Sequence, residues 1–175
     1  RSARRSILVE QQYIRSNQAE PQSLIQALAE ARQTNPGLEL RIVLARAIGG
    51  QKERDKLAAE IGILKQFGFQ LGKHIRLLSP KFFVHCHNKL VIVDDEQVLI
   101  SSQNWSAAAL TKNREAGVII HSAPIARFYR SIFDVDWETG LKTLSSAACS
   151  TPFDLAALGL GQRMVPLSIG DIADV

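Results

Sequence analysis

The sequence predicts an α/β fold in which a mixed β-sheet is flanked by helices on both faces. Short apolar runs rich in β-branched residues alternate with longer segments whose apolar residues recur at helical spacing. Two of the later runs are separated only by Asp94-Asp95-Glu96, which is typical of a turn between antiparallel strands. An alternating order that contains one such hairpin indicates a mixed sheet.

The first half of the chain predicts three strands and two helices. Pro21 begins the first helix, and Asn35-Pro36-Gly37 ends it. Gly68 ends the second helix. The predicted strands are residues 7–9, 38–45 and 75–78, and the predicted helices are residues 21–34 and 52–67.

The second half predicts the hairpin and two further helices around another strand. The predicted elements are an almost continuous strand over residues 82–102, broken at the turn, then a helix at 106–110, a strand at 117–120 and an amphipathic helix at 124–137. After Gly140 the pattern weakens, with one short helix expected at 153–158. We therefore expect one domain over residues 1–140 and a peripheral C-terminal tail over residues 141–175.

Composition narrows the possible partners. The chain has 175 residues, of which 46% are hydrophobic and 22% charged, as in an ordinary globular domain. Its net charge of +4 favours anionic partners such as nucleic acid, phospholipid headgroups or phosphate esters. Two cysteines, Cys86 and Cys149, encode no disulfide framework. No signal peptide or membrane span is predicted, the Arg1 start suggests a fragment or a processed product, and the sequence leaves the compartment open.

The residues most suited to chemistry lie around His87-Asn88-Lys89. Alternate residues of a strand share a face, so His87 and Lys89 are expected to project together, with His85 beside them. An imidazole can act as nucleophile or proton carrier, and a nearby ammonium supplies charge for an anionic substrate. Asp94 has the opposite parity, so we expect it to hold the hairpin turn.

A second group follows the hairpin. Ser102 and Asn104 share a face, where a hydroxyl and a carboxamide could donate to phosphate oxygens. Glu115 could hydrogen-bond one ring nitrogen of His87 and fix its tautomer. Together these residues suggest a nucleophile, its orienting carboxylate and a phosphate cradle.

The spacing of these residues resembles the signature of the phospholipase D superfamily. The matching residues are His87-x-Lys89-x4-Asp94, then Ser101-Ser102-x-Asn104, then Glu115, with Ser101 in place of the usual glycine. The opening Ile7–Tyr13 segment and the Phe133–Trp137 segment resemble the start and end of the second half of two-motif members. Residues 1–140 would then be a catalytic half-domain with the fold of that superfamily.

The resemblance implies a metal-independent and cofactor-independent phosphodiesterase that works in two steps. His87 would be one of a pair of histidines, of which one forms a phosphohistidine and the other protonates the leaving oxygen. Lys89, Asn104 and Ser102 would hold the nonbridging oxygens, and Glu115 would orient His87. Because the chain has one such motif, the second histidine is expected from an N-terminal half or from an identical subunit.

Several other interpretations remain open at this stage. A zinc site at His85-Cys86-His87 is disfavoured, because Cys86 points to the opposite face and no second ligand pair follows. Trp105 is a possible substrate wall, whereas His74 and His121 are interpreted as ordinary surface or edge residues. The preferred substrate is a phospholipid, and the alternatives are a homodimeric nuclease on DNA or RNA and a non-catalytic half that binds polyanions or serves in assembly.

Overall fold

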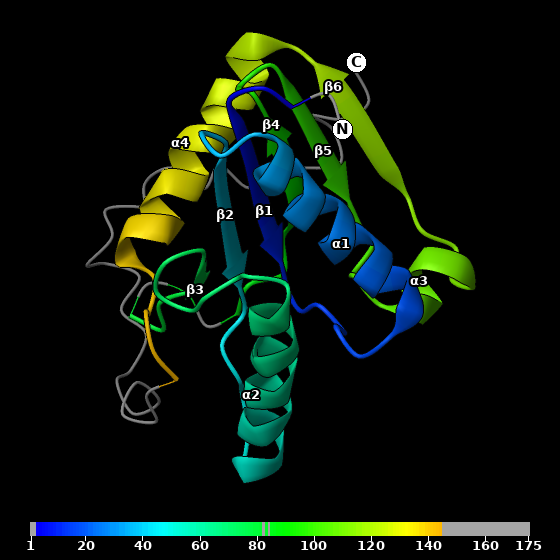
Figure 1. Cartoon of the computed structure of the whole chain (residues 1–175), viewed down its shortest axis with the longest axis vertical. Helices are drawn as coiled ribbons and strands as arrows, with labels where there is room; N and C mark the ends of the chain where they lie inside the picture. Colours follow the sequence, from blue (N-terminus) through cyan, green and yellow to red (C-terminus); the bar gives the residue numbers. More distant parts are fainter. Residues whose placement is uncertain (1–2, 82, 84, 145–175) are drawn as a thin grey trace, which may run out of the picture.

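The structure, a computed structural model, describes residues 3–81, 83 and 85–144. Its centre is a six-stranded sheet in the order β3-β2-β1-β4-β5-β6 (Figure 1). The strands β1 (Ser6–Gln11), β2 (Glu39–Leu44) and β3 (Ile75–Leu77) are parallel to one another. The strands β4 (Lys89–Val93), β5 (Gln97–Ser101) and β6 (Gly117–His121) continue the sheet with antiparallel pairing. The predicted mixed sheet is therefore confirmed.

Helices cover both faces of the sheet, as the sequence predicts. Alternate residues of β1 show why, since Ile7 and Val9 pack with one set of helices while Leu8 packs with another. The first set is α1 (Ala19–Thr34) and α2 (Gln51–Gln66). The second face is covered by α4 (Ala123–Thr139), and the short α3 (Ala107–Thr111) follows β5.

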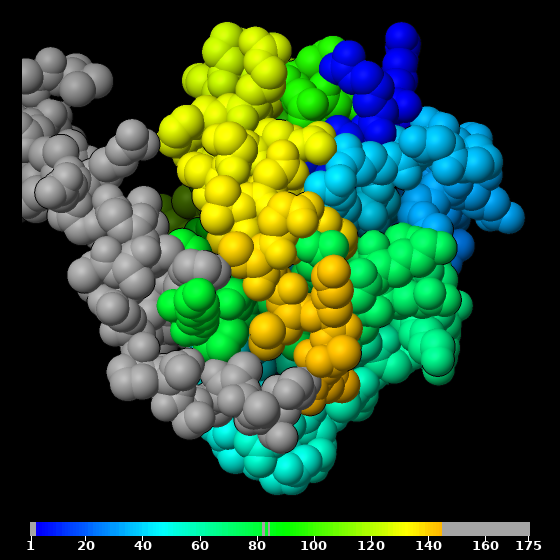
Figure 2. Space-filling view, turned by 90° about the vertical axis from the view of Figure 1, so that its left-hand side faces the viewer, coloured from blue at the N-terminus to red at the C-terminus, as the bar shows by residue number. Residues whose placement is uncertain are grey.

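Helix α4 forms one side of the molecule. Figure 2 shows it in yellow along this side, with residues 141–144 continuing below it in orange. Leu141 exchanges two backbone hydrogen bonds with Leu77 of β3, at 2.7 and 3.0 Å. The packed part of the chain thus continues just past Gly140, and the helix predicted at residues 153–158 lies outside the described residues.

The predicted strand over residues 82–102 is too long at its start. Residues 85–88 are irregular, and β4 begins only at Lys89. The reason is the length of the neighbouring strand, because Gln11, the last residue of β1, pairs with Lys89. Residues 85–88 consequently have no strand beside them, and a strand without a partner leaves its backbone groups unsatisfied.

Candidate active site

The hairpin brings the two parts of the motif to one end of the sheet. β4 begins where β1 ends, and Leu90 near the start of β4 pairs with Ile100 near the end of β5. The backbone of Ser102 continues toward Ala116, whose carbonyl accepts the Ser102 N–H at 2.8 Å. The segments that carry His87, Lys89, Ser102 and Glu115 therefore meet at this end.

His87 and Lys89 lie close together, although not on one strand face as predicted. His87 is exposed in the irregular segment before β4, whereas Lys89 is buried at the first position of the strand. Lys89 Nζ donates to the backbone oxygen of His87 at 2.6 Å. Burial lowers the pKa of Lys89, and the nearby Cys86 and Glu115 partly offset this by favouring the charged form.

Glu115 is bonded differently from the prediction. Its carboxylate accepts hydrogen bonds from Ser102 Oγ at 2.5 Å and from Asn113 Nδ2 at 3.0 Å. Among the described residues no hydrogen bond joins Glu115 to His87. The carboxylate instead accepts a hydrogen bond from Ser102 Oγ on the neighbouring segment. The hydrogen bond from Ser102 is the main reason why the pKa of Glu115 lies below its usual value.

Asn104, two residues after Ser102 in the chain, has a side-chain atom with no hydrogen-bond partner among the described residues. Its side chain is half-buried, and its Oδ1 atom is buried without a partner among the described residues. Its backbone carbonyl accepts the N–H of Ser106, which fixes the turn into α3. Because buried polar groups are normally paired, the unpaired Oδ1 of Asn104 suits a ligand or neighbouring group that brings a hydrogen-bond donor.

A buried polar cluster that sequence reasoning missed holds the His87 segment from behind. Glu10 Oε1 accepts hydrogen bonds from Asn88 Nδ2 at 3.1 Å and from Cys86 Sγ at 3.4 Å. The carboxyl group of Asp136 in α4 lies close to that of Glu10, so each affects the titration of the other. Burial raises the pKa of both groups, that of Asp136 to about 7 with a further contribution from Glu10. The residues on either side of His87 are thus tied to β1 and α4.

Asp94 lies at the hairpin turn, where it binds the start of the chain. Its carboxylate accepts the backbone N–H groups of Arg4, Arg5 and Ser6 at 2.7–3.1 Å. Burial alone would raise its pKa, but these donors, Ser6 first, lower it overall. Asp94 is thus far from the His87 end of β4 and acts within the framework of the fold.

Trp105 and His74 are both buried. Trp105 is 8% exposed and packs in the core with α1 and α2, and it also lines an apolar cavity that Lys89 lines, so its role as a substrate wall stays a prediction. Its backbone carbonyl accepts the N–H of Arg15 at 2.8 Å, which anchors the chain there and directs the ring inward. His74 is buried and accepts the N–H of Gln70, whereas His121 is exposed at the end of the edge strand β6.

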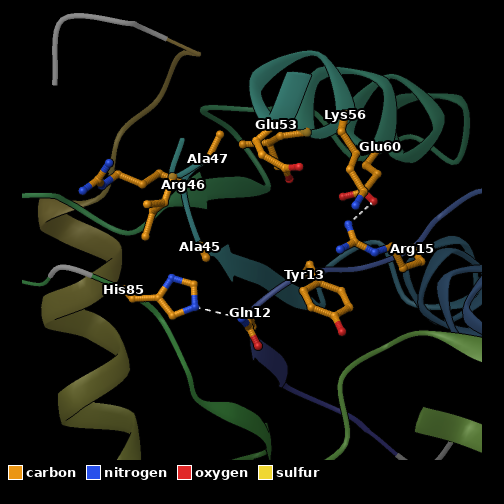
Figure 3. A pocket seen from close by; sticks show the side chains of 12 residues that line it. Gln12, Tyr13, Arg15, Ala45, Arg46, Ala47, Glu53, Lys56, Glu60 and His85 are labelled. Atoms are coloured by element: carbon orange, nitrogen blue, oxygen red, sulfur yellow. Dashed lines mark hydrogen bonds and ion pairs between the residues drawn. The ribbon is translucent and has the colours of Figure 1, made fainter. Parts of the chain in front are cut away.

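Three of the cavities in the described part of the chain adjoin this end of the sheet. The first, of about 300 Å³, is lined by His87 and Lys89 together with Tyr129 and Ile132 of α4. The second, of about 450 Å³, is mainly apolar and lies between α1 and the face of β4–β6, with Lys89 and Ser101 in its wall. The third, of about 190 Å³, is polar and lies where β1 and β2 end against α2 (Figure 3). His85 lines this polar cavity, and its ring centroid is 6.1 Å from that of His87.

Comparison with known proteins identifies the family. The family model described as "Cardiolipin synthase, PLD-like domain" matches residues 1–137. The chain belongs to the phospholipase D superfamily. Its relatives include the mitochondrial cardiolipin hydrolase of Mus musculus, 30% identical over 80 residues that cover 46% of this chain and 34% of the relative. The corresponding protein of Danio rerio is 25% identical over 58% of this chain and 42% of the relative. The matched part is therefore less than half of these relatives.

Solved structures show the same phospholipase D fold. Nuc from Salmonella typhimurium, described as a phospholipase D family member, has a TM-score of 0.59 at 26% identity, over 82% of this chain and 85% of Nuc. The phosphatidylserine synthase of Haemophilus influenzae has a TM-score of 0.60 at 16% identity, over 76% of this chain and 32% of the synthase. At that identity the synthase supports the fold alone. The superfamily resemblance seen in the sequence is thus confirmed.

Neither a metal-ligand cluster nor a membrane-spanning helix occurs in the described part of the chain. Within residues 3–81, 83 and 85–144, no group of three or more His, Cys, Asp or Glu side chains is arranged to hold a metal ion. In the same part of the chain, no helix has the length and apolar character to span a membrane.

Proposed function

We propose that this chain provides one half of a phosphodiesterase active site that acts on a phospholipid through a phosphohistidine. The observation that carries the proposal is the meeting of His87, Lys89 and the Ser102–Glu115 pair at one end of the sheet. The family match, described as a cardiolipin synthase domain, and the cardiolipin hydrolase relatives favour the lipid substrate.

Each residue has a distinct role in the proposed reaction. His87 is exposed and attacks phosphorus, or protonates the leaving oxygen, in partnership with a second histidine. Lys89 exchanges its bond to the His87 carbonyl for a nonbridging phosphate oxygen, while Ser102 and Asn104 donate to the same group. Glu115, already ionised and bound to Ser102, is the carboxylate that orients a histidine. Residues 1–140 would form this half-site, with residues 141–175 peripheral to it.

The sheet face that Lys89 shares offers a surface for the second histidine-bearing half. Lys89 shares its sheet face with Val91, and the apolar cavity on that face also exposes Leu99 and Ile119. Ile119 is 60% exposed on the edge strand, which leaves an uncovered apolar surface continuous with the catalytic residues. We propose that a second motif-bearing half, from an identical subunit or an N-terminal half, covers this face.

A nuclease is the second candidate function. The match to Nuc covers most of that protein, and the net charge of +4 suits a nucleic acid. Both candidates share the same phosphate chemistry and differ in what the remainder of the site recognises.

An activity panel on the His87→Asn variant tests both the chemistry and the substrate. Wild type and variant are compared for alcohol release from phosphatidylcholine and cardiolipin vesicles, transfer to glycerol lipids, and cleavage of single-stranded and double-stranded DNA and of RNA. In the self-associated chain, or after addition of a second motif-bearing half, we expect lipid turnover by the wild type, and its loss in the variant with unchanged thermal stability. The matched control is His121→Asn, since His121 is also exposed but lies at the opposite end of the hairpin sheet.

Wild-type rates in the His87→Asn variant would contradict the catalytic assignment. Cleavage of nucleic acid alone, lost in the same variant, would replace the lipid proposal with the nuclease. A chain that binds polyanions without turning over any diester, alone or with a second half, would favour the non-catalytic interpretation.

A further inference from the structure

We infer that Glu10 is a positioning residue for the proposed reaction, because it holds the two residues that flank His87. Glu10 lies near the end of β1, which is a central strand of the sheet beside β4 (Figure 1). Its side chain shares a face with Leu8, which packs with α4. The inference rests on the proposed function and adds to it a residue that touches no substrate. Glu10 acts only through the position of His87.

The segment that carries His87 lacks the support of a neighbouring strand. β1 ends at Gln11, which pairs with Lys89, so residues 85–88 extend beyond the last paired position. His87 is exposed in this segment, and Lys89 Nζ donates to its carbonyl at 2.6 Å. Because ladder hydrogen bonds are missing here, side-chain contacts must keep the segment in one conformation.

Glu10 supplies two such contacts through one atom. Its Oε1 accepts hydrogen bonds from Asn88 Nδ2 at 3.1 Å and from Cys86 Sγ at 3.4 Å. Cys86 is 2% exposed, whereas His87 is exposed. Both neighbours of His87 are therefore bound to one buried carboxyl group, and the imidazole between them stays accessible to a substrate.

The hydrogen bonds to Glu10 matter most when another contact is given up. In the proposed reaction, Lys89 exchanges the His87 carbonyl for a nonbridging phosphate oxygen. Glu10 keeps its hydrogen bonds to Asn88 and Cys86 through this exchange, because neither residue is needed to bind the phosphate. A displacement of about 1 Å in a reacting group can lower a rate about a hundredfold, so the rate depends on a segment that stays fixed.

The position of Glu10 is unfavourable for the fold itself. Glu10 is 1% exposed, and its cross-strand neighbours are the buried apolar residues Val43 and Leu90. Its Oε2 atom has no hydrogen-bond partner among the described residues, and the carboxyl group of Asp136 lies close to it. Burial raises the pKa of Glu10. Since a buried carboxyl group adds little to stability, its place behind His87 favours a role in the reaction.

The test compares two substitutions of Glu10 that differ in one property. Glu10→Gln keeps a side-chain oxygen that can accept from Asn88, whereas Glu10→Met has a similar size and lacks this oxygen. Glu60→Met is the matched control, because Glu60 is also a buried carboxyl group and accepts a hydrogen bond from Arg15 at 2.5 Å on α2.

Three quantities are measured on the full chain. The kcat and KM for bis(4-nitrophenyl) phosphate, a small diester, are determined with the chain self-associated or supplied with a second motif-bearing half. Urea unfolding gives the stability of each variant. Relaxation of the backbone ¹⁵N nucleus gives the order parameter of His87, which requires no turnover.

We expect Glu10→Met to lower kcat at least tenfold and to leave KM within twofold, because the phosphate still binds while the imidazole is no longer held. The order parameter of His87 should fall from about 0.85 to below about 0.6. Glu10→Gln should stay near the wild type in both measurements. Glu60→Met should lower stability and leave the kcat and the order parameter unchanged.

An order parameter of His87 that keeps its wild-type value in Glu10→Met would overturn the inference, whether or not the chain is active. An equal loss of kcat in Glu60→Met would also overturn it, because both losses would then reflect stability. A Glu10→Gln chain that behaves like Glu10→Met would show that the accepting oxygen does not position His87.

Failure of the proposed function gives a different result. If the wild type turned over no diester with a second half present, the proposed function would be contradicted. A lowered order parameter in Glu10→Met would still show that Glu10 holds the His87 segment.

Discussion

Ser102 donates its hydroxyl hydrogen to Oε2 of Glu115 at 2.5 Å, and this bond joins the end of β5 to the segment before β6. The Ser102 hydroxyl also accepts the N–H of Ala116 at 3.0 Å, so its orientation is fixed at both ends. A serine predicted to bind phosphate and a carboxylate predicted to orient an imidazole are thus a single unit. A phosphate that takes the Ser102 hydroxyl would release Glu115 for a histidine.

Replacing Ser102 therefore changes the titration of Glu115. In Ser102→Ala we expect the pKa of Glu115 to rise toward its ordinary value, because the donor that mainly stabilises the carboxylate is lost. Turnover should fall in the same variant. Carboxyl carbon shifts followed by NMR against pH measure the change. Ser101→Ala is the control, because the Ser101 hydroxyl bonds to Gln103 and Ala116 instead, and an equal shift there would contradict the assignment.

The carboxyl pair behind His87 predicts a pH-dependent stability. The pKa of Asp136 is raised to about 7, so between about pH 4 and pH 7 the folded chain keeps a proton that the unfolded chain has lost. The free energy of unfolding should therefore decrease as the pH rises through this range, by at most about 1.4 kcal/mol per pH unit, and level off above it. Urea unfolding at several pH values measures the slope.

Asp136→Asn should flatten this dependence, because the amide stays neutral at every pH in this range. Glu138→Gln, an exposed carboxyl on the same helix, is the control and should leave the slope as in the wild type. A slope that persists in Asp136→Asn would show that other groups cause it.

Asp94 is expected to affect stability rather than chemistry. Asp94→Asn retains the side-chain shape but replaces one accepting oxygen with a donor that faces backbone N–H groups. We expect a loss of about 1–2 kcal/mol in the free energy of unfolding, the usual effect of leaving one such donor unsatisfied. Because the pKa of Asp94 is lowered in the folded chain, its wild-type contribution should be present above about pH 4 and be lost as the pH falls further. Loss of turnover without loss of stability would contradict this structural role.

Ser101 and Gly117 form a matched pair across β5 and β6. A methyl group at position 117 would lie 3.1 Å from Ser101 Oγ and 3.3 Å from the Ile100 carbonyl. Gly117→Ala should therefore destabilise the chain by about 1 kcal/mol, as overpacking does. In a Ser101→Gly background the cost should shrink, so a double-mutant cycle by urea unfolding should show a coupling of about 0.5 kcal/mol or more. Additive effects would mean that the two residues do not share this space.

The elements of the fold were predictable because their signals are local. Helical spacing, Pro21 and Gly68 located α1 and α2 within two residues of their observed bounds. The start of β4 was missed because it depends on where β1 ends, and strand length is set by a neighbour far away in sequence. The same reason explains Glu10 and Asp136, which lie 126 positions apart in the chain, so no spacing rule joins them.

The residues of the candidate site were also predictable from the sequence, whereas their hydrogen-bond partners were not. The motif spacing pointed to His87, Lys89, Ser102 and Glu115, which the structure gathers at one end of the sheet. It misjudged the partner of Glu115, because the hydrogen bond from Ser102 arises from the β5–β6 register. The polar cavity at His85 was not predictable from the sequence, because α2, far from His85 in the chain, supplies three of the five charged side chains in its wall.

The last prediction concerns the uncovered face of the sheet. Ile119 is 60% exposed and faces the cavity that Lys89 and Ser101 also line, so a second half that completes the site would bury it. Ile119→Arg should weaken association at least tenfold, because a desolvated arginine would replace an apolar contact at the interface. Sedimentation velocity over a concentration series measures association, and diester turnover is followed in the same samples.

Val118→Arg is the control, since Val118 is 51% exposed on the same strand but faces the α4 side. We expect association and turnover to fall together in Ile119→Arg and to persist in Val118→Arg. Full turnover by a strictly monomeric Ile119→Arg chain would show that one motif suffices, and the shared site would have to be abandoned.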